Sequence, residues 1–239
     1  MSELETGYYA TVDENFNQAY KLITTEQSHA ELINMLNNGN IVQKQLAALK
    51  IETIYNKEEA QILINNLTGQ DGKIREAVSA KINELMHSPD TALFFDTKAH
   101  YKVFLDAIID INGNICRNII SAISTLKENK EFCNLFCQEL SNRALALANI
   151  IKDFDFQDGK YKVNKEVFKL YWYLETIYIF ANQLDFNKLK EIISITKNIN
   201  EYTIREKTAK ILTLNFDDSD LVLARELLKN DTNYYVRRF

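Results

Sequence analysis

Three cysteines are the side chains of this chain that most readily suggest metal binding or redox chemistry. Cys133 and Cys137 are four residues apart, so on a helix both thiols would point in the same direction. A zinc site built from them would need two further ligands, and no histidine lies near them in the sequence. We therefore expect Cys116, Cys133 and Cys137 to be small buried hydrophobic residues.

Histidine suggests a general base or a metal ligand. The three histidines, His29, His87 and His100, are scattered, and none of them is followed by Glu. The chain also has no Gly-rich phosphate loop, no Gly-x-Ser-x-Gly elbow and no zinc-type His/Glu pair. We expect surface or loop histidines, no catalytic residue, no cofactor and no metal.

An aromatic run, Tyr171-Trp172-Tyr173 with Tyr178 beyond it, could bind a partner, since Tyr and Trp are enriched in protein interfaces. Consecutive residues of a helix point in different directions, so at least one of Trp172 and Tyr173 should lie near solvent or against the adjacent loop. The alternative is a helix that is buried on two sides and uses its rings to fill space.

Arg75, Arg205 and Arg237 each follow the first apolar residue of a similar helical segment. They could form a ladder of hydrogen bonds near the turns, or a basic stripe that recognises an acidic partner. The residues that we expect to bind a partner are Arg75, Arg117, Tyr171, Trp172, Tyr178 and Arg205.

The segment 72–85, GKIREAVSAKINEL, shows most clearly which elements hold these side chains. Asp71 can cap a helix here by accepting a hydrogen bond from a first-turn N–H group. Apolar residues then follow at spacings of four, four and three, which form one stripe on a helix; they are Ile74, Val78, Ile82 and Leu85.

Weaker copies of this stripe recur at intervals of roughly 30 to 50 residues, which is typical of a helical solenoid. The copies are Ile115, Ile119, Ile123 and Leu126; Val163, Val167, Tyr171 and Leu174; Ile204, Thr208 and Leu212; more loosely Val42, Leu46 and Leu49; and an opening at Val236-Arg237-Arg238-Phe239. Small residues such as Ala47-Ala48 and Ser79-Ala80 in the middle of the copies would let a neighbouring helix approach closely.

These helices begin with an apolar residue followed by Arg, have small residues at their centre and follow an Asp/Asn/Gly turn. In these features they resemble the second helices of HEAT-like (armadillo-type) repeats. The resemblance covers most of the chain from about Ser28. It implies an all-α fold, an α-solenoid with a right-handed superhelix of antiparallel helix pairs. The chain departs from the family in having a single proline, Pro89, and an aromatic fourth unit. The alternative is a non-repetitive helical bundle.

We expect one α-solenoid domain over 1–239, with a tail and capping helix in 1–26 and about five and a half repeats in 28–239. A capping box at Thr11–Glu14 would open the N-terminal helix, whose apolar face would include Phe16 and Ile23 and cover the first repeat. Lys130–Lys152 should form one long helix.

Acidic residues outnumber basic residues by 33 to 28, which makes a broad nucleic-acid-binding surface unlikely. No apolar run is long enough to span a membrane, and no secretory signal is visible. Three cysteines cannot all pair within one chain, which favours a reducing cytoplasm.

The sequence thus predicts a non-enzymatic scaffold or adaptor that binds another protein along the concave second-helix face of the solenoid. The alternatives are enzymes that the resemblance brings with it: a DNA glycosylase-like protein, disfavoured because Trp172 is the only tryptophan, or a bilin lyase-like protein. HEAT-like hydroxylases that bind iron through His-Glu dipeptides are excluded because the chain has no such dipeptide.

Overall fold

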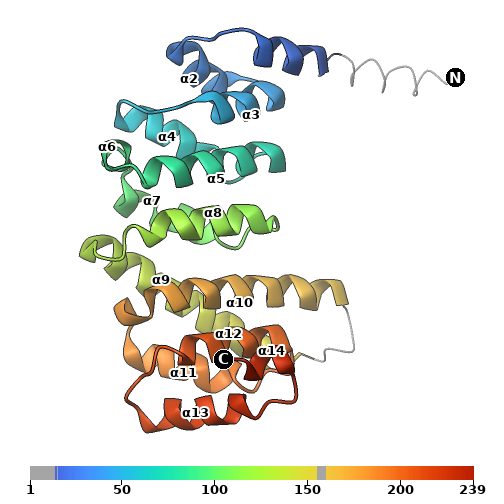
Figure 1. Ribbon diagram of the computed structural model, residues 1–239, viewed down its shortest axis with the longest axis vertical. Helices are drawn as coiled ribbons and strands as arrows, with labels where there is room; N and C mark the ends of the chain where they lie inside the picture. Colours follow the sequence, from blue (N-terminus) through green and yellow to red (C-terminus); the bar gives the residue numbers. More distant parts are fainter. Residues whose placement is uncertain (1–13, 15, 155–159) are drawn as a thin grey trace, which may run out of the picture. The chain divides into compact units, whose positions relative to one another are not determined.

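The computed structural model describes residues 14, 16–154 and 160–239, with the side chains of 160–164 excepted. In these ranges the chain consists of helices and short connections, and no β-strand is present (Figure 1). After a helix over 16–24, the elements in chain order are α2 (His29–Asn38), α3 (Ile41–Lys50), α4 (Lys57–Asn65), α5 (Gly72–Met86), α6 (Pro89–Ala92), α7 (Thr97–Ala107), α8 (Gly113–Ser124), α9 (Lys130–Ile151), α10 (Lys160–Phe180), the 3-10 turn η1 (Ala181–Gln183), α11 (Phe186–Thr196), α12 (Tyr202–Leu212), α13 (Ser219–Lys229) and α14 (Tyr234–Arg237).

The chain divides into two compact units, which we describe separately. The first unit comprises Met1–Val103 and Arg117–Ala122, and the second comprises Phe104–Cys116 and Ile123–Phe239. Both α7 and α8 contribute residues to each unit. The expectation of one domain over 1–239 with a right-handed twist stays a prediction.

Within each unit, helices contact their hairpin partner and the equivalent helix of the next pair. In the first unit α2 packs against α3 and α4, and α3 packs against α5. In the second unit α9, α11 and α13 form one layer, while α10, α12 and α14 form the other (Figure 1). The predicted all-α solenoid architecture is thereby confirmed within each unit, because neighbours in sequence are also neighbours in space.

The central helix of the first unit, α5, forms as the sequence predicts. The Asp71 side chain accepts a hydrogen bond from the backbone N–H of Lys73 and caps the helix. All four residues of the predicted stripe are buried, from Ile74 to Leu85. The small residue Ser79 is also buried, which allows α5 to lie close to its neighbours.

In α12 the stripe is buried throughout, including Thr208, and in α8 Ile115, Ile119 and Ile123 are buried. Leu126, the last residue of that predicted copy, lies beyond the end of α8 and is half-buried. The hydroxyl of Thr208 donates to Ile204 O and contacts the Thr196 hydroxyl, at 2.9 Å each, so this polar residue is satisfied inside the core. Val163, the first residue of another copy, lies outside the residues whose side chains the structure describes.

The predicted looser copy of the stripe in α3 is partly wrong. Leu49 is exposed, and the buried residues are Ala47 and Ala48. The helix also ends at Lys50. The chain beyond it is non-helical over 51–55 and buries Ile51 and Ile54. These non-helical residues therefore contribute to the core of the first unit.

The N-terminal helix over 16–24 corrects a second prediction. Phe16 and Ile23, which we expected to pack on the first repeat, are both exposed. Polar contacts join the helix to the first pair instead: the Lys50 ammonium donates to Leu22 O at 2.9 Å and to Thr25 O at 2.9 Å. The predicted capping box at Thr11–Glu14 lies largely outside the described residues.

The second unit has the long helix that the sequence predicts, since α9 runs from Lys130 to Ile151. Its rings form the centre of the core: Phe136 stacks on Phe132 with ring centroids 4.9 Å apart, and it lies 5.3 Å from Phe180 at the end of α10. α10 packs against both α9 and α12, so it is buried on two sides.

Two adjacent residues of α9 provide a matched test of this packing. Ile151 is fully buried and Ile150 is 55% exposed. We expect Ile151→Ala to lower the free energy of unfolding by about 2–4 kcal/mol because it leaves a cavity. Ile150→Ala should change it by less than about 1 kcal/mol.

The measurement is urea unfolding followed by fluorescence. Trp172 is the only tryptophan and lies in the second unit, so its emission reports on that unit directly. Equal destabilisation by the two substitutions would contradict the assignment of the buried face of α9.

Candidate functional site

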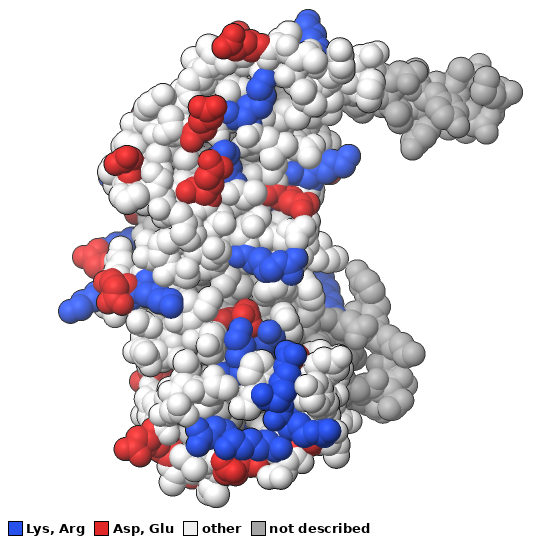
Figure 2. All heavy atoms as spheres, in the orientation of Figure 1, with Lys and Arg blue, Asp and Glu red and all other residues white. Residues whose placement is uncertain are grey.

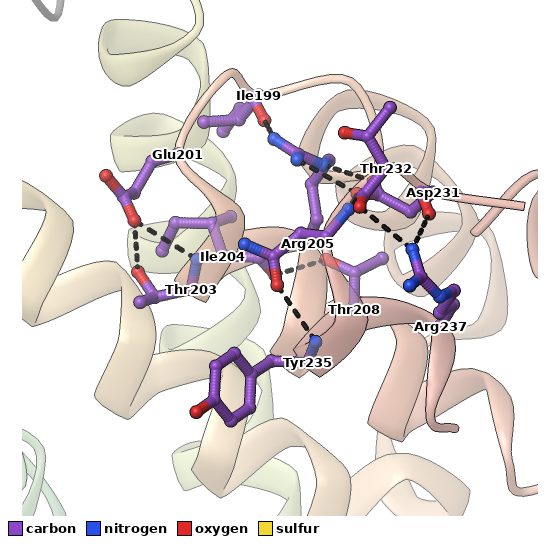
Figure 3. A network of polar contacts seen from close by, with 11 residues as sticks. Ile199, Glu201, Thr203, Ile204, Arg205, Thr208, Asp231, Thr232, Tyr235 and Arg237 are labelled. Atoms are coloured by element: carbon purple, nitrogen blue, oxygen red, sulfur yellow. Dashed lines mark hydrogen bonds and ion pairs between the residues drawn. The ribbon is translucent and has the colours of Figure 1, made fainter. Parts of the chain in front are cut away.

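Arg205 on α12 connects its own helix to the turn between α13 and α14. Its Nε donates to Asp231 Oδ2 at 2.7 Å, its Nη2 donates to Oδ1 at 3.2 Å, and its Nη1 donates to Ile199 O at 2.8 Å (Figure 3). Asp231 in turn accepts from the backbone N–H of Asn233. The guanidinium therefore fixes the two turns that precede α12 and α14.

The other two arginines of this repeat position make the same kind of contact. Arg75 donates to Gln70 O, five residues earlier. Arg237 donates to Thr232 O at 2.8 Å and to Asp231 O at 3.1 Å. These bonds to turn carbonyls support the interpretation of the arginines as a ladder. A partner-binding role for Arg75 and Arg205 stays a prediction that these contacts do not favour.

Trp172 and Tyr173 are both buried, at 6% and 4% exposure, so the expectation that one of them lies near solvent is wrong. The Trp172 ring meets Tyr171 and Phe168 edge to face, with centroids 5.2 and 6.0 Å apart. Because α10 is flanked by α9 and α12, Trp172, Tyr173 and Leu174 are all buried, which supports the alternative interpretation of a helix buried on two sides. Arg117, on α8, is exposed.

Tyr171 and Tyr178 lie half-buried on α10, each beneath a lysine from α12. The Lys207 ammonium lies 4.4 Å from the centroid of the Tyr171 ring, and the Lys210 ammonium lies 4.5 Å from that of Tyr178. Between the rings, Glu175 pairs with both lysines: Oε2 is 2.7 Å from Lys207 Nζ and Oε1 is 2.6 Å from Lys210 Nζ. We call these five residues the lysine–tyrosine face.

Helical spacing explains why these residues meet. Tyr171, Glu175 and Tyr178 are four and three residues apart, so they form one stripe along α10, and Lys207 and Lys210 are three apart on α12. α10 and α12 pack side by side in the same layer, which brings the two stripes together (Figure 1).

The charges of this face stabilise one another. Burial alone would raise the pKa of Glu175, but hydrogen bonds from Lys207 and Lys210 outweigh it and hold that pKa below its ordinary value. Burial would lower the pKa of Lys207, but hydrogen bonds with Glu175 and Tyr171 raise it. Glu175 and Lys207 are therefore both charged near neutral pH, and the side chains of Lys207 and Lys210 share one carboxylate.

The surface continues from α12 towards the end of the chain. Arg238 Nη2 lies 2.6 Å from Glu206 Oε1, and the Arg238 guanidinium is 5.5 Å from the Tyr235 ring centroid. Figure 2 shows Lys and Arg side chains gathered over the α10–α14 part of this face, with fewer acidic side chains among them. A basic group above an aromatic ring thus recurs on neighbouring helices.

A second charged network holds the opposite side of α10. Arg143 on α9 pairs with Asp106 at 2.6 Å and with Glu139 at 2.8 Å. Burial raises the pKa of the Tyr173 phenol, although its hydrogen bond to Arg143 acts in the opposite direction. Tyr173 is therefore a neutral partner that helps fix how α10 is rotated about its axis.

A groove of the second unit lies between α9 and α11 and has a volume of ≈ 410 Å³. Cys133 and Cys137 line it, and both are buried free thiols, as predicted. Burial and the neighbouring Cys133 raise the pKa of Cys137 to about 12, so this thiol is protonated and a poor nucleophile.

The described ranges contain no group of three or more His, Cys, Asp or Glu side chains placed to hold a metal ion. Within those same ranges, no helix has the length and apolar character needed to cross a membrane. His29 contacts Glu59 at 3.0 Å and packs edge to face on Tyr55, so it joins α2 to the start of α4.

Tyr171 and Tyr178 were predicted from the sequence, whereas Lys207, Lys210 and Glu175 were not. The stripe of Tyr171, Glu175 and Tyr178 was visible in the spacing. Its pairing with α12 was not, because the lysines are more than thirty residues away and only the packing of two second helices brings them together.

Two solved structures are similar to this chain at low sequence identity. The crystal structure of an engineered protein, a Northeast Structural Genomics Consortium target, is 11% identical, with a TM-score of 0.48 over 89% of this chain and 93% of that chain. A designed armadillo repeat protein is 12% identical, with a TM-score of 0.44 over 88% of this chain and 96% of that chain. No protein-family model matches the chain, and no curated protein matches it in sequence.

The Arg205–Asp231 pair yields a prediction about acid stability. The hydrogen bond from Arg205 holds the pKa of Asp231 below its ordinary value of 3.8. The resulting stabilisation is fully present above the unfolded-state pKa and is lost as the pH falls through the lower folded-state value. Asp231→Asn should lower the free energy of unfolding at pH 7 by about 1–2 kcal/mol and reduce its fall between about pH 5 and 2.

Urea titrations at several pH values, followed by circular dichroism, would measure both effects. The control is Asp217→Asn, at an exposed position in the preceding connection, which should change stability by less than about 0.5 kcal/mol. An unchanged acid dependence in Asp231→Asn would show that this carboxylate does not lock the last hairpin.

Proposed function

We propose that this chain is a scaffold or adaptor that binds another protein through the second-helix layer of its second unit. The observation that carries the proposal is the lysine–tyrosine face, where two half-buried tyrosine rings are held beneath two lysines. Tyrosine supplies large contact area with few rotatable bonds, which is why it is frequent among residues that dominate binding energy.

The rigidity of this face supports the proposal. Tyr171 lies against Lys207 and Trp172, and Tyr178 lies against Lys210, so both rings are ordered before a partner arrives. Binding then loses less side-chain entropy than it would on a surface of mobile side chains. Neighbouring second helices provide a continuous area around the rings, whereas the grooves of the other layer are lined by Lys190 and Asp220 or by protonated thiols.

The setting that we propose is a reducing cytoplasm, supported by three free cysteines that are all buried. The partner is a protein; nucleic acid and membrane are not expected partners, given the net charge of −5. A DNA glycosylase-like or bilin lyase-like enzyme gains no specific support from the lysine–tyrosine face, since its ionised groups are paired with one another.

We predict that proteins will cross-link to this face in the native cell. A photoreactive phenylalanine analogue at position 178 should capture a defined protein, identified by mass spectrometry. The same analogue at position 223 is the control, because Leu223 is exposed on α13 in the other layer.

Tyr171→Ala and Tyr178→Ala, made together, should weaken binding of the captured protein by about 10- to 100-fold, since two anchors are removed. Circular dichroism would verify that the fold is intact. Equal capture at both photoreactive positions, or recovery of nucleic acid or a pigment alone, would contradict the proposal.

A further inference from the structure

We infer that the lysine–tyrosine face binds carboxylate groups of an acidic segment of the partner protein, and that Glu175 competes with them from within the chain. This inference rests on the proposed function and adds to it the chemistry of the ligand. The occupant is a protein segment in which Asp or Glu residues recur, bound across α10 and α12.

The balance of charge on this surface is the first argument. Lys207 and Lys210 share the single carboxylate of Glu175, so one positive charge of the cluster is not neutralised by it. On the other side of α12, Arg238 pairs with Glu206. The surface thus has three cations and two carboxylates, in a chain whose net charge is −5. A local positive field on an acidic protein attracts acidic segments while repelling other copies of the same chain.

The environment of the lysines is the second argument. The Lys207 side chain is only 11% exposed and Lys210 is 24% exposed, so their charges are less screened by solvent than those of surface lysines. Each ammonium group lies over a tyrosine ring, which holds it in place from below. An ammonium group has three donors, and neither the ring nor Glu175 uses all of them, so a further carboxylate can be accepted.

The spacing of the lysines is the third argument, and it indicates the form of the segment. Residues three apart on a helix have Cβ atoms about 5–6 Å apart. Alternate residues of an extended chain lie on one side and about 6.6 Å apart. A segment with acidic residues at alternate positions therefore matches Lys207 and Lys210, and its intervening side chains alternate to the opposite side.

The role of Glu175 follows from its position. Its two oxygens each contact one lysine at 2.6–2.7 Å, which is the arrangement that a bound carboxylate would adopt. In the unbound protein it keeps the buried ammonium groups paired, which avoids the cost of isolated charges. An incoming carboxylate must share these lysines with it, so Glu175 weakens binding and disfavours weakly acidic partners.

A nucleic acid fits this face less well than an acidic protein segment. Glu175 and Glu206 lie among the cations, where closely spaced phosphates would meet them. A protein segment with carboxylates at two positions can avoid both.

The test uses the full chain and a fluorescein-labelled short peptide in which Glu and Ala alternate. Matched peptides replace every Glu by Gln or by Lys. Fluorescence anisotropy should show binding of the Glu peptide alone, weakening with added salt. Glu175→Gln should tighten binding by about three- to tenfold because the competing carboxylate is lost, and Lys210→Gln should weaken it by about three- to tenfold.

Two further variants keep the result interpretable. Glu206→Gln removes the second carboxylate of this surface and leaves Glu175 paired with Lys207 and Lys210. It should also tighten binding, so it tests the inference independently in case Glu175→Gln disturbs folding. Lys197→Gln is the control, since this lysine lines the groove between α11 and α13 in the other layer, and it should leave binding unchanged.

The inference is overturned if the Gln peptide binds as well as the Glu peptide, or if neither Glu→Gln variant tightens binding. Tighter binding of a single-stranded oligonucleotide of equal charge would assign the face to nucleic acid instead. If the Glu peptide fails to bind while the photoreactive residue at position 178 still captures a protein that the tyrosine variant loses, only this inference fails. If both fail, the proposed function fails with it.

Discussion

The whole structure depends on the fact that no helical hairpin here can bury its apolar surface alone. The packing of α3 against α5 helps to cover the stripe of α5, and α9 and α12 flank α10. Burial of one large aliphatic side chain contributes roughly 1.5–3 kcal/mol, so each interface between pairs is a major source of stability. This constraint aligns second helices within a unit, and it thereby places Tyr171 beside Lys207, although the two lie in different repeats.

Features that depend on local chemistry were predictable from the sequence. The capping box of Ser28 and Glu31 forms as its residues suggest, and so do the caps at Asn56, Asp71 and Asp218. The long helix α9 was predictable because its apolar pattern runs without a break. Such features are decided by residues within one or two turns of each other, and the periodicity of a helix makes these visible.

Features that depend on the position of a neighbouring helix were not predictable. A stripe of residues shows which face of a helix is apolar, but it does not show where the neighbouring helix packs. Leu49 and Phe16 are therefore exposed although both belong to apolar stripes, and Trp172 is buried beside Tyr173. The pairing of Glu175 with Lys207 and Lys210 has the same cause. These contacts join residues more than thirty positions apart, and the sequence has no local pattern that records them.

The repeated arginines and the two lysines of α12 make different kinds of contact. Arg75, Arg205 and Arg237 occupy one repeat position and donate to carbonyls of the preceding turn, a task that every hairpin presents. Lys207 and Lys210 pair instead with the carboxylate of Glu175. They lie over the rings of Tyr171 and Tyr178, which belong to the irregular fourth unit. The arginines that recur with the repeat therefore fix its turns, whereas the lysine–tyrosine face occurs where one hairpin departs from the repeat.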